Sequence, residues 1–215
     1  MQLCASSARP AGRLLRSGAF AGLLALLALT ALLALPAPAR GDCAEVEPLS
    51  LLPADEACPG WARDGEPLTA HTPEELAAII DGQAFLYVSY GFVAAAFQNY
   101  VAEIAGEPVA ATVAIFNQGT PENALALYQD PGSGEGTPVA DWPGTGGARQ
   151  QVAFGSVTFQ FHEACFFASV VLMPGDESTA PEARCLAEEI LGLIQGATPA
   201  SGATWGEIKR HFEPR

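Results

Sequence analysis

Three side chains in this sequence are candidates for acid–base chemistry. His162 and Glu163 are adjacent at the predicted end of a strand, where a general base or metal ligand can face solvent. Asp81 stands beside Gly82 in an apolar helical stretch, and such a break in a local pattern is typical of functional or strained positions. Asp81 and His162, with or without a metal, would suit a hydrolase. The structural alternative is that Gly82 lets a partner backbone approach closely enough to bind Asp81, or that Asp81 is simply exposed.

Other catalytic patterns are missing from the sequence. The three histidines after residue 40 follow neither H-x-x-x-H nor H-E-x-x-H spacing. The glycine-rich segment 132–136 has no lysine and contains Glu135, which would repel a phosphate. Gly155-Ser156 lacks the G-x-S-x-G context of a serine nucleophile. The sequence therefore predicts no cofactor and no metal.

Aromatic residues are the candidates for ligand binding. Tyr87, Tyr90 and Tyr100 could line a pocket, and Trp142 lies in a long loop that could act as a lid or contact surface. Packing in the core is the favoured alternative for the tyrosines. The leading hypothesis is a non-catalytic binding or interaction module for a small molecule or an envelope protein. The other hypotheses are the hydrolase and a structural envelope protein.

The N-terminus has the three parts of a secretory signal peptide. Arg9, Arg13 and Arg16 precede an apolar run over residues 19–35, and Ala37-Pro38-Ala39 is a small-x-small cleavage pattern. A retained membrane anchor is the alternative, although the run is short and prolines follow it. Cleavage after residue 39 leaves 176 of the 215 residues, with seven basic against 24 acidic residues and a net charge of −17. Such a charge disfavours nucleic acid and anionic lipid as partners.

Four cysteines remain after cleavage, and an even number in an exported chain predicts two disulfides. Three pairings are possible. The preferred one joins Cys43 to Cys58, within the N-terminal segment, and Cys165 to Cys185, between a strand and the next helix. Metal binding by these thiols is disfavoured because no C-x-x-C spacing occurs.

The hydrophobic pattern predicts an α+β domain over residues 71–196, an antiparallel sheet of about five strands with helices packed on it. Residues 40–70 are expected to be an ordered but irregular lead-in, with Leu49, Leu51, Leu52 and Trp61 touching the core. Residues 197–215 are expected to be a tail with a short amphipathic segment. The predicted order is α-β-β-α-β-β-β-α, with helices over 73–90 and 121–128 and from about 180 to 195, strands over 92–101, 109–116, 151–154, 157–162 and 165–173, and a loop over 130–149.

Several segments together resemble an uncharacterised family of exported bacterial proteins, a domain of unknown function. The similarity spans about residues 49–128 and continues more loosely to 194. The segments are Leu51-Leu52-Pro53, Pro59-Gly60-Trp61, Ile80-Asp81-Gly82-Gln83-Ala84, Tyr90-Gly91-Phe92, Tyr100 and Gly119-Thr120-Pro121-Glu122-Asn123-Ala124. The resemblance implies a bacterial exported α+β domain, secreted or periplasmic, and it implies no activity, substrate or catalytic residue.

Overall fold

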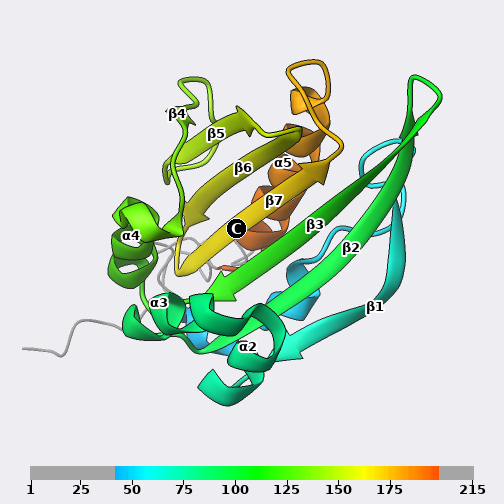
Figure 1. The fold of residues 1–215 in the computed structure, drawn as a ribbon. Helices are drawn as coiled ribbons and strands as arrows, with labels where there is room; N and C mark the ends of the chain where they lie inside the picture. Colours follow the sequence, from blue (N-terminus) through cyan, green and yellow to red (C-terminus); the bar gives the residue numbers. More distant parts are fainter. Residues whose placement is uncertain (1–41, 199–215) are drawn as a thin grey trace, which may run out of the picture. The chain divides into compact units, whose positions relative to one another are not determined.

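An antiparallel sheet of seven strands, in the order β1-β2-β3-β7-β6-β5-β4, forms the centre of the computed structural model, which describes residues 42–198 (Figure 1). The α+β class is confirmed, but the prediction of about five strands was wrong. The predicted signal peptide and the amphipathic segment of the tail lie outside the described residues. The strands are β1 (Ala62–Ala70), β2 (Ala94–Ile104), β3 (Glu107–Asn117), β4 (Thr137–Pro138), β5 (Ala148–Ala153), β6 (Ser156–Glu163) and β7 (Phe166–Met173).

The two strands that the hydrophobic pattern did not predict lie at the two edges of the sheet. β1 falls in the segment expected to be irregular, and it contains Gly65 and Pro67, near the irregularity between Asp64 and Leu68 in its pairing with β2. β4 has only two residues and lies within the predicted loop over 130–149. Edge strands bury few side chains, and they tolerate proline and bulges. Their sequences therefore lack the apolar alternation that identifies a central strand.

The helices begin where the capping residues predict. Thr72 and Glu75 form a capping box at the start of α2 (Pro73–Ile80), and Thr120 caps α4 (Pro121–Gln129). The long C-terminal helix is α5 (Ala180–Ala197). The prediction of one helix over 73–90 was wrong, because Asp81 has a φ of 52° and ends α2. A 3-10 turn, η4 (Asp81–Gln83), then leads into α3 (Ala84–Ser89).

The helices cover the two faces of the sheet unequally. Alternate residues of β7 show the division: Phe166, Ala168, Val170 and Leu172 belong to one buried cluster, whereas Phe167 belongs to the other. The first cluster packs against α5 and the lead-in, and the second packs against α2, α3 and α4. Figure 1 shows α5 behind the sheet and the three short helices in front of one end of its strands. Among residues 42–198, no helix is both long and apolar enough to cross a membrane.

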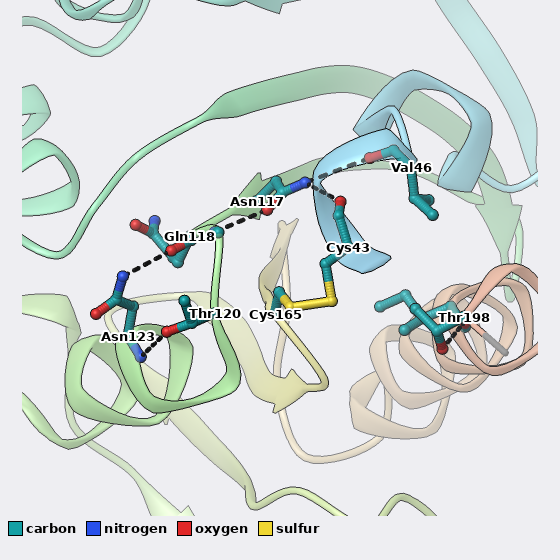
Figure 2. The surroundings of a disulfide bond; sticks show 10 residues. Cys43, Val46, Asn117, Gln118, Thr120, Asn123, Cys165 and Thr198 are labelled. Carbon is teal, nitrogen blue, oxygen red and sulfur yellow. Dashed lines mark hydrogen bonds between the residues drawn. A yellow bond between two sulfur atoms is a disulfide. The ribbon is translucent and has the colours of Figure 1, made fainter. Parts of the chain in front are cut away.

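Two disulfides fasten the lead-in to the C-terminal half of the domain. Cys43 bonds to Cys165, and Cys58 bonds to Cys185 of α5. The preferred pairing of Cys43 with Cys58 was therefore wrong. Nearness along the chain suggested it, but the lead-in crosses the face that α5 covers, so each of its cysteines meets a residue more than 120 positions away. Figure 2 shows Asn117, at the end of β3, donating from Nδ2 to the Cys43 carbonyl oxygen at 2.7 Å beside the first disulfide.

The lead-in is part of the hydrophobic core. Leu51, Leu52 and Trp61 are buried as predicted, whereas Leu49 is 45% exposed and makes no part of the core. The indole N–H of Trp61 donates to Glu182 of α5 at 3.0 Å, and the hydroxyl of Tyr100 donates to the carbonyl of Pro53 at 2.8 Å. Strand β2 and helix α5 are thus both hydrogen-bonded to the part of the lead-in that precedes β1.

Candidate binding site

The helix-bearing face of the sheet is covered over only part of its length. Strand pairing sets its side chains in rows that cross the sheet. One row lies beneath the short helices and is mostly buried: Ala95, Phe116, Phe167 and His162. The next is mixed: Phe97, Ala114, Ser169, Gln160 and Arg149. The third, which we call the open row, is partly or fully exposed at every position: Asn99, Thr112, Val171, Thr158 and Gln151.

The open row is exposed on one side only. The neighbouring residues of the same strands point to the opposite face, and Tyr100, Val113, Val157 and Leu172 there are completely buried. Within the row, the Thr112 hydroxyl donates to Asn99 Oδ1 at 3.0 Å. Polar and small side chains fit a surface that meets solvent. The middle of the sheet therefore presents a hydrogen-bonding surface beside the short helices.

Arg149 ends the mixed row, and three of its N–H groups bind protein oxygens. Its Nε donates to Gln160 Oε1, its Nη1 to the Tyr128 carbonyl and its Nη2 to Ser133 Oγ, each at 2.8 Å. The amide nitrogen of Gln160 donates to the carbonyl of Ser133, also at 2.8 Å. We call these four residues the Arg149 cluster. Strands β5 and β6, the end of α4 and the turn η5 (Pro131–Ser133) are joined by it.

The charge of Arg149 has no carboxylate partner in the described part of the chain, where the salt bridges involve Arg184 and His71 only. Partial burial lowers the pKa of Arg149, while nearby Tyr128 and Tyr87 act in the opposite direction. Arg63 also lacks a carboxylate, but it is exposed. Arg149 is thus the one described arginine that is partly buried without a compensating anion.

Tyr87 of α3 lies within the electrostatic reach of Arg149. Its ring stacks on Phe116 with centroids 3.9 Å apart, and burial raises its pKa to about 12, against the opposing effect of the Arg149 charge. The Tyr87 hydroxyl has no hydrogen-bond partner among the described residues. It therefore retains its capacity to donate and to accept.

The hydrolase candidates do not come together: Asp81 begins η4, whereas His162 and Glu163 lie at the end of β6. His162 lies under α4, where its Nε2 accepts the Gly147 N–H at 2.8 Å and its ring is 4.9 Å from that of Tyr128. Burial lowers its pKa, and the adjacent Glu163 only partly opposes this. Asp81 is exposed at the junction of α2 and η4, and its hydrogen-bonding partners do not include His162. A Cβ added at Gly82 would meet nothing within 4 Å, so the predicted close approach of a partner backbone was wrong.

Glu163 points to the opposite face from His162, because successive strand residues alternate. It is 5% exposed and accepts hydrogen bonds from the Thr145 hydroxyl at 2.7 Å and the Gly146 N–H at 2.9 Å. These bonds fix the loop before β5. The geometry gives Glu163 a structural task and does not bring it together with Asp81.

The tyrosines and Trp142 are divided between the two layers. Tyr87 and Tyr90 lie on the side of the short helices, where the Tyr90 hydroxyl donates to Asp130 at 2.6 Å. Tyr100 is completely buried in the other layer, and Trp142 packs there on Phe159 and Phe161. The four aromatic residues therefore do not line one pocket.

Two open hollows flank the candidate site. One, of about 280 Å³, lies between the start of α4 and the loop before β5, and it is lined by Glu122, Leu125, Thr145 and His162 among others. The other, of about 630 Å³, lies along the β4–β5 edge between Glu135 and Glu177. In the first hollow the acid beside His162 is Glu122. Asp81 takes no part in either.

Sequence reasoning missed Arg149, although one signal pointed to it. Arg149 is the only lysine or arginine between residues 64 and 183, a stretch in which acidic residues are frequent. A solitary cation in an acidic domain indicates a specific structural or binding task. Its partners could not be predicted, because Tyr128, Ser133 and Gln160 come from three separate segments.

Comparisons with known proteins add little. No protein-family model matches the chain, and no curated protein matches it, so the resemblance to an exported bacterial family has no family model behind it. Among solved structures, the chain is similar to the extracellular domain of PknH from Mycobacterium tuberculosis, with a TM-score of 0.38 and 14% identity. The match covers 66% of this chain and 93% of that one. A likeness at this level carries no argument about function.

Proposed function

We propose that the domain after the signal peptide is an exported, non-catalytic binding module, and that its ligand lies on the open row. Export is supported by the signal-peptide pattern and by two disulfides, which form and persist in oxidising compartments. The secreted and periplasmic locations both fit. Either an unknown small molecule or an envelope protein would be a suitable ligand for such a module.

The observation that carries this proposal is the one-sided exposure of the open row. Thr112, Val171 and Thr158 belong to β3, β7 and β6, which lie in the interior of the sheet and not at its edges. The side chains opposite them on the reverse face are buried, and short helices cover the same face two rows away. A rigid sheet with one uncovered, hydrogen-bonding area is suited to hold a partner without rearrangement.

The geometry gives less support to the alternative, a hydrolase using Asp81 and His162. The unprotonated nitrogen that a general base needs is occupied at His162 by the Gly147 N–H. Asp81 lies next to α2 and η4, whereas His162 is under α4. The site lacks the direct base–acid contact that such a mechanism requires.

Native mass spectrometry of the protein purified from its own exported compartment tests the proposal. We expect the wild type to carry a bound mass that Thr158→Trp loses, because the indole would fill the open row. The matched control is Gln195→Trp, at an exposed position of α5 on the other side of the sheet, and it should keep the bound mass. A bare polypeptide mass in the wild type, or a ligand retained by Thr158→Trp, would contradict the proposal.

A further inference from the structure

We propose that Arg149 is the anchor for the carboxylate group of a ligand that extends over the open row. This inference rests on the proposed function and deepens it, because it names the chemistry that the module recognises. The carboxylate could belong to a small organic acid or to the C-terminus of a peptide. Both present the same planar anion to the guanidinium.

The first argument is the number of hydrogen bonds that Arg149 still has to offer. A guanidinium carries five N–H groups. Three of them donate to Gln160, Tyr128 and Ser133, one from each nitrogen. One N–H therefore remains on each terminal nitrogen, and Arg149 is not fully buried. Two N–H groups on a fixed guanidinium therefore remain for charge-assisted hydrogen bonds, and a carboxylate offers two oxygens to accept them.

The second argument is charge. A partly desolvated cation is stabilised by a nearby anion, and Arg149 has none within salt-bridge distance among the described residues. The cluster fixes the guanidinium in place with neutral oxygens only. Binding a carboxylate would supply the missing charge without moving the side chain.

The third argument separates a carboxylate from a phosphate. Arg149 is the only cation between residues 64 and 183, and the mature domain has a net charge of −17. A dianion would meet one cation and a strongly negative surrounding field. A monoanion is matched by a single guanidinium. The electrostatics therefore favour a singly charged carboxylate.

The fourth argument is continuity with the open row. Gln160 of the Arg149 cluster comes two residues after Thr158 on the same face of β6, and Ser169 lies beside Gln160 on β7. Tyr87 adds a hydroxyl without a protein partner in the described region, and its pKa responds to the Arg149 charge. A ligand held at Arg149 can thus extend past Gln160 and Ser169 towards Thr158, and Tyr87 is the candidate second donor on the same side of the sheet.

Titrations followed by NMR of the full mature chain test the assignment. The probes are 4-hydroxyphenylacetate, its neutral amide, the peptide Gly-Gly-Tyr with a free C-terminus, the same peptide with an amidated C-terminus, and inorganic phosphate. We expect at least one free carboxylate to shift the Arg149 Nε–H signal, with its amide and phosphate at least about tenfold weaker. Whether the acid or the peptide binds more tightly distinguishes the two sources.

Variants complete the test. Arg149→Lys keeps the charge but loses the paired N–H groups, and we expect about a tenfold loss of carboxylate affinity. Arg63→Lys is the matched control and should bind as the wild type does. Tyr87→Phe keeps the stacked ring and removes only the hydroxyl, so it tests the site even if Arg149→Lys fails to fold. We expect Tyr87→Phe to weaken binding several-fold.

The inference is overturned if the amides bind as well as the acids, if no carboxylate shifts Arg149, or if Tyr87→Phe and Arg149→Lys leave affinity unchanged. The proposed function fails separately. If Thr158→Trp releases the native ligand but Arg149→Lys retains it, the proposed binding module is supported. The assignment of Arg149 as the carboxylate anchor is then contradicted. A wild type that carries no native ligand contradicts the module itself.

Discussion

The guanidinium carbon of Arg149 lies 4.6 Å from the centroid of the Tyr128 ring, so that a cation from β5 covers an aromatic face on α4. The same guanidinium is also held by the backbone, because it donates a hydrogen bond to the Tyr128 carbonyl in the last turn of α4. A cation at a helix C-terminus is favourable because the free carbonyls there carry partial negative charge. One side chain thereby fixes the end of α4 to the sheet.

Arg149→Lys is expected to destabilise the domain by about 1–3 kcal/mol, because an ammonium cannot make three divergent hydrogen bonds and also cover the Tyr128 ring. Urea unfolding at neutral pH measures the difference. Arg63→Lys gives up two hydrogen bonds to the carbonyls of Pro53 and Leu52 but covers no aromatic ring, and it should lose less. A loss well below about 1 kcal/mol in Arg149→Lys would show that the cluster adds nothing to stability.

Removal of the disulfide between Cys58 and Cys185 is expected to lower the free energy of unfolding by about 3–5 kcal/mol, because with Cys43–Cys165 intact it still closes a loop of roughly 35 residues in the unfolded chain. Cys58→Ala with Cys185→Ala should unfold at a lower urea concentration than the wild type. Non-reducing peptide mapping is the accompanying control. A peptide that links Cys43 to Cys58 would contradict the pairing described above.

Gln118→Met is expected to be neutral or stabilising. Gln118 is completely buried, and neither its amide oxygen nor its amide nitrogen has a partner in the described region. An unpaired buried amide costs about 1–3 kcal/mol, which an apolar side chain of similar size avoids. Gln160→Met is the matched control, since both ends of that amide are bonded, and it should destabilise. Thermal unfolding of both variants decides the matter, and a clear loss in Gln118→Met would count against it.

Stability is expected to fall as the pH drops below about 6.5, because of His162. Burial holds its pKa below its ordinary value of 6.5, so in this range the unfolded chain takes up a proton that the folded chain does not. Protonation would also end its acceptance of the Gly147 N–H. The slope is at most about 1.4 kcal/mol per pH unit. Unfolding midpoints at pH 7.5 and pH 5 should differ less in His162→Gln than in the wild type. Asp130, whose pKa is lowered chiefly by the Tyr90 hydroxyl, acts only in more acidic solution.

Gly146→Ala is expected to be strongly destabilising, whereas Gly82→Ala should be tolerated. A Cβ on Gly146 would overlap the carbonyl oxygen of His162, which is backbone and cannot move aside. A Cβ on Gly82 would meet nothing within 4 Å. Soluble yield and melting temperature of the two variants give the comparison. A stable Gly146→Ala protein would contradict the close approach of that loop to β6.

The central strands and the helix starts could be predicted because their signals are local. Thr72 and Glu75 act within one helical turn, and the nearly continuous apolar run of β7 is visible over eight residues. The sequence showed that Asp81 interrupts an apolar pattern, but it did not show that the helix ends there. The edge strand β1 could not be predicted, because its pairing with β2 depends on partners 25 or more residues away and not on its own composition.

The sequence alone determined the export pattern, the acidity, the even cysteine count and the α+β class, because each depends on composition or on neighbours along the chain. Only the tertiary structure decided the disulfide pairs, the layer to which each aromatic residue belongs and the surroundings of Arg149. The reason is physical. Successive residues of a strand point to opposite faces of the sheet, so Tyr100 and Asn99 are neighbours in sequence but lie on different surfaces. Contacts of that kind are decided by how the sheet assembles.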